Sequence, residues 1–152
     1  RRKNDPASVH KDPAHIVALR KLDSYRGNKL WAPDKQKLFY SGVTDTLREY
    51  ISERYGFGAM EMTTAEIFNE MKDTDAPKEL LKEIKELFEL ADFVKFAKFV
   101  ASDEDNAAVL PVAVRFVTET YQAEVESEIP VMSSDSPVMS SEAGTSNNGG
   151  QN

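Results

Sequence analysis

The sequence predicts an all-α protein, a compact bundle of about five helices followed by a disordered C-terminal tail. Apolar residues recur at spacings of three and four along most of the chain. The two runs most like strands, 93–100 and 109–117, fit helical spacing at least as well. Residues 127–152 lack aromatic residues, Lys and Arg, and are rich in Ser, Gly and Asn. We therefore expect a linker over residues 1–11, a helical domain over 12–126 and the tail over 127–152.

The first helix is expected to begin at Asp12-Pro13, where an acidic cap precedes a proline of the first turn. The second is expected to begin at Ala32-Pro33 and to end at Gly56, a residue suited to the left-handed conformation after a helix. Gly42 lies inside this second helix, where glycine costs about 1 kcal/mol relative to alanine. Its presence predicts close contact with another helix.

Two helices are expected in the middle of the chain. Thr63 and Glu66 form a capping-box pattern at the start of a short helix. Pro77 begins the next helix, and the sequence from Leu90 to Val100 is apolar nearly all round. Such a segment is typical of burial from several sides, which predicts that Phe96 lies at the centre of the core. Truncating a central phenylalanine to alanine is expected to cost about 3–5 kcal/mol.

The last helix is preceded by a cap at Ser102 with acidic residues in the following turn. Pro111 fits the first turn of a helix or kinks one, because it cannot donate the interior hydrogen bond. We therefore expect the firm part of this helix to run from about Leu110 to about Val125.

Composition excludes several classes of function. The chain has 152 residues, no Cys, two His and a formal net charge of −7. Without Cys there is no disulfide, no Cys-ligated zinc or iron–sulfur cluster and no Cys nucleophile. The two histidines, His10 and His15, are five residues apart, whereas a metal pair on one helix face needs a spacing of three or four. No glycine-rich phosphate loop or nucleophile elbow occurs, and we assign no catalytic, cofactor-binding or metal-binding residue.

Charge is distributed unevenly. Residues 1–37 hold ten Lys/Arg and four Asp/Glu, a net of +6, and residues 38–126 hold nine Lys/Arg and nineteen Asp/Glu, a net of −10. A basic N-terminal segment followed by a longer acidic segment argues against nucleic acid as the main partner, because phosphate binding needs a broad cationic face. The chain opens Arg1-Arg2-Lys3, a pattern typical of the cytoplasmic end of a membrane-spanning helix and also of a merely charged terminus.

A few polar and aromatic residues are candidates for a specific structural or binding role. Asp92, Lys95 and Lys98 interrupt the apolar segment, either as a solvated stripe with a local ion pair or as a buried polar pair that fixes helix register or a partner. Aromatic residues of the first half lie near Lys and Arg, which fits an interface or the core equally well. The residues singled out for interaction or structure are Trp31, Tyr40, Tyr55, Glu61, Thr63, Glu66, Asp92, Lys95 and Lys98.

Several strings together resemble a known family. They include Leu30-Trp31, Arg54-Tyr55-Gly56, Glu61-Met62-Thr63-Thr64-x-Glu66-Ile67, and Leu90-Ala91-Asp92-Phe93-Val94-Lys95-Phe96-Ala97-Lys98. Over roughly residues 12–121 the chain resembles the cytoplasmic helical domain of membrane proteins from bacterial aerotolerance (Bat) operons, especially those of Bacteroides relatives.

The resemblance implies a non-catalytic interaction or adaptor module on the cytoplasmic side of the bacterial inner membrane. Its implied partners are MoxR-type AAA+ ATPases or von Willebrand A-domain membrane proteins, with a membrane tether upstream of Arg1. Two alternatives from other classes are a small hydrolase acting through carboxylates and a helix-turn-helix nucleic-acid binder. The tail carries a seven-residue near-repeat, beginning at Pro130 and again at Pro137, which is either low complexity or a duplicated binding motif.

Overall fold

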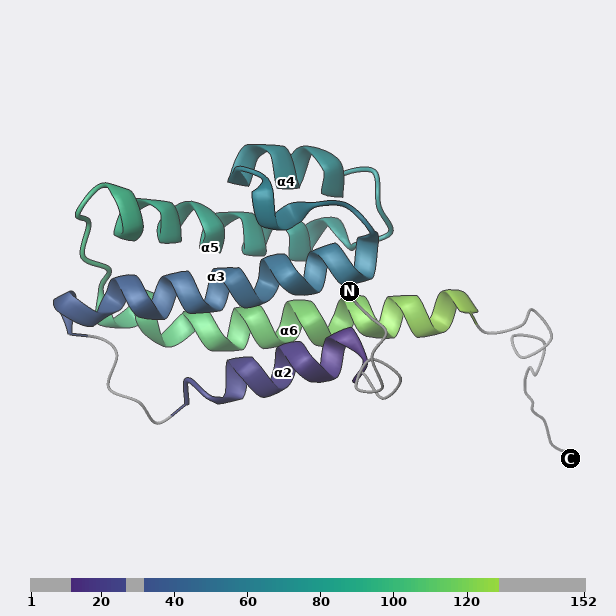
Figure 1. The fold of residues 1–152 in the computed structure, drawn as a ribbon, viewed down its shortest axis with the longest axis horizontal. Coiled ribbons are helices and arrows are strands. Elements are labelled where there is room, and N and C mark those ends of the chain that lie inside the picture. Colours follow the sequence, from purple (N-terminus) through teal and green to yellow (C-terminus); the bar gives the residue numbers. More distant parts are fainter. Residues whose placement is uncertain (1–11, 27–31, 129–152) are drawn as a thin grey trace, which may run out of the picture. The chain divides into compact units, whose positions relative to one another are not determined.

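The computed structural model describes residues 12–26 and 32–128. These residues form five α-helices and no strand, which confirms the all-α prediction (Figure 1). The predicted linker 1–11, Trp31 and residues 129–152 of the predicted tail lie outside the described residues, whereas the first two residues of that tail, Ser127 and Glu128, belong to the last helix. The elements are α2 (Ala14–Asp23), α3 (Pro33–Tyr55), the 3₁₀ turn η1 (Ala59–Glu61), α4 (Thr64–Met71), α5 (Lys78–Phe96) and α6 (Asp103–Glu128).

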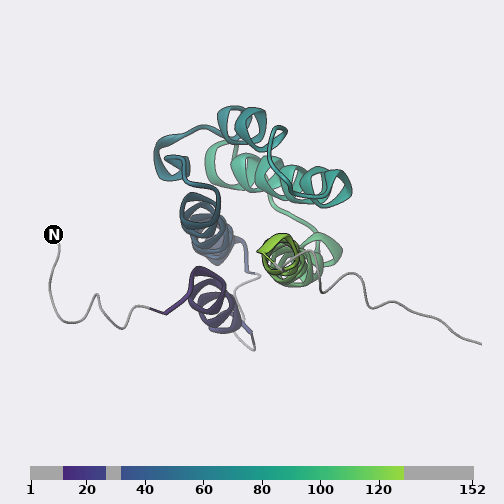
Figure 2. The ribbon, with the colours of Figure 1, turned by 90° about the vertical axis from the view of Figure 1, so that its right-hand side faces the viewer.

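The chain divides into two units after Tyr121, and α6 continues across that boundary. In the first unit, α3 packs against α2, η1 and α5, and α4 packs against α5. Chain direction reverses from α2 to α3, from α3 to α5 and from α5 to the first part of α6 (Figure 1). Viewed from the side, α3 lies between α2 and the α4–α5 pair (Figure 2). None of the described helices combines the length and apolar character that a membrane span needs.

Local sequence signals set most of the helix ends. Pro33 occupies the first turn of α3, and Gly56 ends that helix with φ = 82° and its N–H 2.9 Å from the Ser52 carbonyl. Ser102 caps α6 as expected, because its hydroxyl accepts the Asp105 N–H at 3.0 Å. The expected cap at Asp12 is wrong. Pro13 precedes α2, and no side chain caps that helix.

Asp12 forms an exposed ion pair instead of a cap. Its carboxylate lies 2.9 Å from the Arg20 guanidinium, two turns further along the chain. Because α2 begins with Pro13 in the flanking position, the Asp12 side chain is one residue too early to accept a first-turn N–H. An exposed pair of this kind contributes little to stability.

The core of the first unit is a continuous apolar cluster contributed by all five helices. Its largest fully buried side chains are Tyr40, Tyr50, Phe39, Phe88, Phe116, Leu22, Leu47, Ile51, Ile67, Met71, Ile84 and Val43. The close contact expected at Gly42 is present, since the Tyr25 hydroxyl occupies the space that a Cβ would fill. Tyr25 lies in the turn that follows α2, so the glycine makes room on α3 for this side chain.

The last helix is regular from Asp103, directly after its Ser102 cap, to Glu128, whereas its firm part was expected to run only from about Leu110 to about Val125. Pro111 lies inside it. A proline in a helix interior leaves the carbonyl four residues earlier, here that of Ala107, without its backbone donor. Both Ala107 and Pro111 are exposed, so water can solvate that carbonyl and the helix continues through the proline.

The expectation that the segment from Leu90 to Val100 forms the centre of the core is wrong. Phe96 is 77% exposed, and the helix ends there instead of continuing to Val100. The buried stripe of α5 runs through Ala91 and Val94, and a residue two positions further along lies about 200° round the helix axis. Phe93 and Phe96 therefore face away from the core although their neighbours are buried.

Candidate functional site

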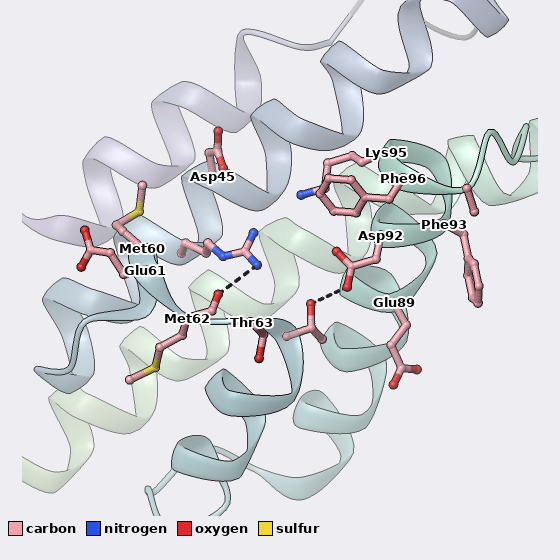
Figure 3. A pocket seen from close by; sticks show the side chains of 13 residues that line it. Asp45, Met60, Glu61, Met62, Thr63, Glu89, Asp92, Phe93, Lys95 and Phe96 are labelled. Atoms are coloured by element: carbon pink, nitrogen blue, oxygen red, sulfur yellow. Dashed lines mark hydrogen bonds between the residues drawn. The ribbon is translucent and has the colours of Figure 1, made fainter.

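An open groove of about 1020 Å³ lies where three segments of the first unit meet (Figure 3). One wall is the middle of α3, the second is the η1 turn with the start of α4, and the third is the C-terminal half of α5. The lining residues are Asp45, Arg48, Met60, Glu61, Met62, Thr63, Thr64, Glu89, Asp92, Phe93, Lys95, Phe96 and Ala97.

Hydrogen bonds to α3 position the wall formed by η1 and the start of α4. The Ala59 N–H donates to the Ser52 hydroxyl at 3.1 Å, and the Arg48 guanidinium lies 3.5 Å from the Met62 carbonyl. The predicted capping box then begins α4. The Glu66 N–H donates to the Thr63 hydroxyl at 3.2 Å, and the Thr63 N–H donates to the Glu66 carboxylate at 2.9 Å.

Two polar residues of α5 connect it to the other walls. The Thr64 hydroxyl at the start of α4 donates to the Asp92 carboxylate at 2.7 Å. The Lys95 ammonium lies 3.5 Å from the Thr44 hydroxyl on α3. Asp92 and Lys95 are half-buried, and each bonds to a neighbouring helix, so they match neither the solvated stripe nor the buried pair suggested by the sequence. Bonds of this kind favour one register of α5 against its neighbours. Glu61 and Thr63, also singled out by the sequence, line the same groove.

Both cations of the groove already have partners within the protein. The Arg48 guanidinium lies 5.2 Å from the centre of the Phe88 ring, and the Lys95 ammonium lies 5.4 Å from the centre of the Phe96 ring. Burial lowers the pKa of Lys95, the nearby Arg48 charge lowers it further, and Asp92 and Asp45 act in the opposite direction. Both cationic side chains are therefore partly buried and in contact with the protein, and neither is fully surrounded by water.

Large apolar side chains are exposed around the groove. Phe96 at 77%, Phe93 at 58% and Met60 at 49% are all more exposed than core residues of their type. Met60 lies on one side of the groove, and Phe93 and Phe96 lie on the α5 side (Figure 3). Exposed apolar side chains gathered in one place, with polar groups around them, are typical of surfaces that bind another molecule.

The connection after α5 begins with a residue in the left-handed conformation. Lys98 has φ = 56°, and the Phe99 N–H beyond it donates back to the Phe93 carbonyl at 3.3 Å. Lys98 thus takes the place that glycine usually occupies after a helix. The sharp reversal leaves the next two apolar residues, Phe99 and Val100, exposed beside the helix end.

We expect Lys98→Gly to raise the free energy of unfolding by about 0.5–1 kcal/mol. The left-handed conformation costs a residue with a Cβ about 1–2 kcal/mol, and glycine loses part of this gain through the larger entropy of its unfolded chain. Urea unfolding followed by circular dichroism measures the change. Lys98→Ala is the matched control, since it removes the same side chain and keeps the strain. Equal stabilities of the two variants would contradict this account.

The other residues singled out by the sequence lie away from the groove. Tyr40 is buried, and its hydroxyl donates to the Asn106 side chain at 2.8 Å. Burial, with Asp105 as a smaller cause, raises the pKa of Tyr40 above its ordinary range. Tyr55 packs beneath the Arg54 guanidinium, 4.4 Å from the ring centre. Both tyrosines therefore contact other parts of the same chain and do not line the groove.

The described histidine and acidic side chains do not gather into a metal site. His15 stacks on Tyr121, with ring centres 3.6 Å apart, and His10 lies outside the described residues. Across residues 12–26 and 32–128, no group of three or more His, Asp or Glu side chains is arranged to hold a metal ion.

Sequence reasoning missed the most exposed part of the site. The segment of Phe93 and Phe96 was expected to be core, whereas both residues are exposed, and Met60, which the sequence did not single out, is exposed as well. The available signal was the excess of apolar residues at one helix end, too many for a single buried stripe.

Searches of family models, of curated proteins and of solved structures found no match to this chain.

Proposed function

We propose that this chain is a non-catalytic interaction module that binds another protein through the groove between α3, α4 and α5. The observation that supports the proposal most strongly is the exposure of Met60, Phe93 and Phe96 at the groove. Aromatic residues, Met and Arg are enriched in protein interfaces, and a few such residues usually dominate the binding energy.

The rigid framework of the groove also supports a binding role. Its walls are joined by the bonds from Arg48 to Met62, from Thr64 to Asp92 and from Lys95 to Thr44. A surface that is already ordered loses less conformational entropy when a partner binds. The exposed aromatic side chains therefore project from a frame that is fixed before association.

The partners we propose follow from the resemblance of residues 12–121 to the cytoplasmic helical domain of Bat-operon membrane proteins. They are a MoxR-type AAA+ ATPase or a von Willebrand A-domain protein, encountered at the cytoplasmic side of a bacterial inner membrane. The strings that carry the resemblance contribute much of the groove, including Glu61, Thr63, Asp92 and Lys95.

Binding of the purified 152-residue chain to purified candidate partners tests this proposal. Biolayer interferometry should give saturable binding to one of them. Phe93→Ala and Phe96→Ala should each weaken that binding at least tenfold, because truncation of a central aromatic side chain typically costs 2 kcal/mol or more. Leu38→Ala is the control, since Leu38 is 70% exposed on α3 and does not line the groove. Equal loss with all three variants, or no binding, would contradict the proposal.

A further inference from the structure

We propose that the segment bound in the groove is a basic amphipathic helix of the partner, with an apolar face against the aromatic side chains and Lys or Arg residues along its edges. This inference rests on the proposed function and adds the chemistry of the bound segment. It is carried by the charge of the groove, by the internal pairing of the groove cations and by the arrangement of its exposed apolar residues.

The charge lining the groove is predominantly negative. Four carboxylates and two cations line it. Three of the carboxylates, those of Asp45, Glu61 and Glu89, belong to exposed residues, one on each wall of the groove. Within residues 12–26 and 32–128, no Lys, Arg or His forms an ion pair with any of these three. None of the three is held in a direct ion pair, although Asp45 also attracts Lys95 at longer range, so Glu61 and Glu89 are the carboxylates most available to a partner.

The two cations lower the net charge of the lining from −4 to −2, and both are engaged in contacts within the protein. Arg48 is directed to the Met62 carbonyl and the Phe88 ring, and Lys95 is directed to the Thr44 hydroxyl and the Phe96 ring. An acidic segment would have to compete with these internal contacts. A basic segment meets the three exposed carboxylates directly, and complementary charge of this kind accelerates association and selects the partner.

The apolar residues of the groove suit one face of a helix. Phe93 and Phe96 are three residues apart on α5 and both line the groove, with Met60 on another wall. The Phe96 ring lies over the groove beside Lys95, whereas the Phe93 ring lies at its outer edge (Figure 3). An amphipathic helix offers apolar residues at spacings of three, four and seven, which is the usual form of recognition in an open apolar groove. Small-molecule sites enclose most of their ligand, whereas Phe96 remains 77% exposed.

Fluorescence anisotropy with synthetic peptides tests this inference on the full chain. The probe is an 18-residue labelled peptide with Leu at helical spacings of three and four and Lys at the remaining positions. One control has Glu in place of every Lys, a second has Gln there, and a third has the composition of the probe in scrambled order. We expect the basic peptide to bind at least tenfold more tightly than each of the three controls.

Variants of the protein show whether that binding uses the groove. Phe96→Ala should weaken binding of the basic peptide at least tenfold, and Leu38→Ala should leave it unchanged. The triple variant Asp45→Asn, Glu61→Gln and Glu89→Gln should also weaken it about tenfold and should reduce its dependence on salt concentration. Circular dichroism of each variant confirms that the fold is retained, which is expected because all of these side chains are exposed.

The possible failures have different meanings. Preference for the Gln or Glu peptide, with the same loss on Phe96→Ala, would overturn the basic-helix inference and leave the proposed function standing. If Phe96→Ala left the affinity for the basic peptide unchanged, the inference would be overturned. If this variant also left the affinity for the candidate partner proteins unchanged, the proposed function would fail too. Self-association of the chain in sedimentation, lost on Phe96→Ala, would show that a second copy occupies the groove and would overturn the inference.

Discussion

Phe88→Ala is expected to lower the free energy of unfolding by about 3–5 kcal/mol, the usual cost of truncating a buried phenylalanine. Phe88 is 1% exposed, and its ring packs edge to face against Phe68 with ring centres 5.3 Å apart. The Arg48 guanidinium also lies over this ring. The truncation removes apolar burial and both ring contacts, and it leaves a cavity between α4 and α5. Urea unfolding followed by circular dichroism measures the loss.

Phe96→Ala is the matched comparison, because it makes the same chemical change on the same helix. Phe96 is exposed and loses little burial on truncation, so its cost should be below about 0.5 kcal/mol. If the two variants lost equal stability, the outward orientation of Phe96 would be wrong. The experiment therefore decides between the core position suggested by the sequence and the exposed position in the structure.

Gln36→Leu is expected to cost about 2–4 kcal/mol, although Leu is the more apolar residue and similar in size. The buried Gln36 amide donates to the Ala101 carbonyl at 3.2 Å, and its oxygen accepts the Ala101 N–H at 2.9 Å. Ala101 is itself buried. Replacing Gln36 leaves two backbone groups desolvated without partners, and each such group costs about 1–3 kcal/mol. Urea unfolding again measures the change.

Lys37→Leu is the control for this experiment, since Lys37 is the next residue of α3 and is exposed. It should change stability by less than about 0.5 kcal/mol. Hydrogen exchange adds a local test, because the Ala101 N–H should exchange much faster in Gln36→Leu than in the parent protein. Unchanged protection of that N–H would mean that Gln36 does not hold the α5–α6 connection.

Local sequence rules predicted the features that depend on neighbouring residues. The capping box of Thr63 and Glu66 and the left-handed Gly56 are decided within one helical turn, so their residue types alone identify them. Gly42 was predicted to lie at a close helix contact because nothing local explains glycine inside a helix. The sequence could not identify its neighbour, Tyr25, because that contact depends on how α2 crosses α3.

The errors arose where tertiary structure decides between two local possibilities. An apolar helix end is either buried on several sides or exposed for a partner, and Phe96 has the same local sequence in both cases. Pro111 is tolerated inside α6 because the affected carbonyl lies on the exposed side, which local sequence does not specify.

The sequence identified some residues of the candidate site but not the contacts between its walls, because those contacts depend on tertiary structure. Asp92 and Lys95 stood out as polar residues in an apolar segment, and both line the groove. Their partners, Thr64 and Thr44, are separated from them by many residues, so the connections between walls required the structure. Trp31 lies outside the described residues, and its predicted role stays a prediction.

Site-specific photo-crosslinking in cells that express the natural gene product tests the central claim most directly. A photoreactive phenylalanine at position 96 should give a discrete adduct with another protein, and mapping should place the crosslink in a basic helical segment. The same probe at position 38, where an equally exposed apolar residue lies outside the groove, should give no such adduct. Identical crosslinking from both positions, or none from position 96, would contradict a binding role for the groove.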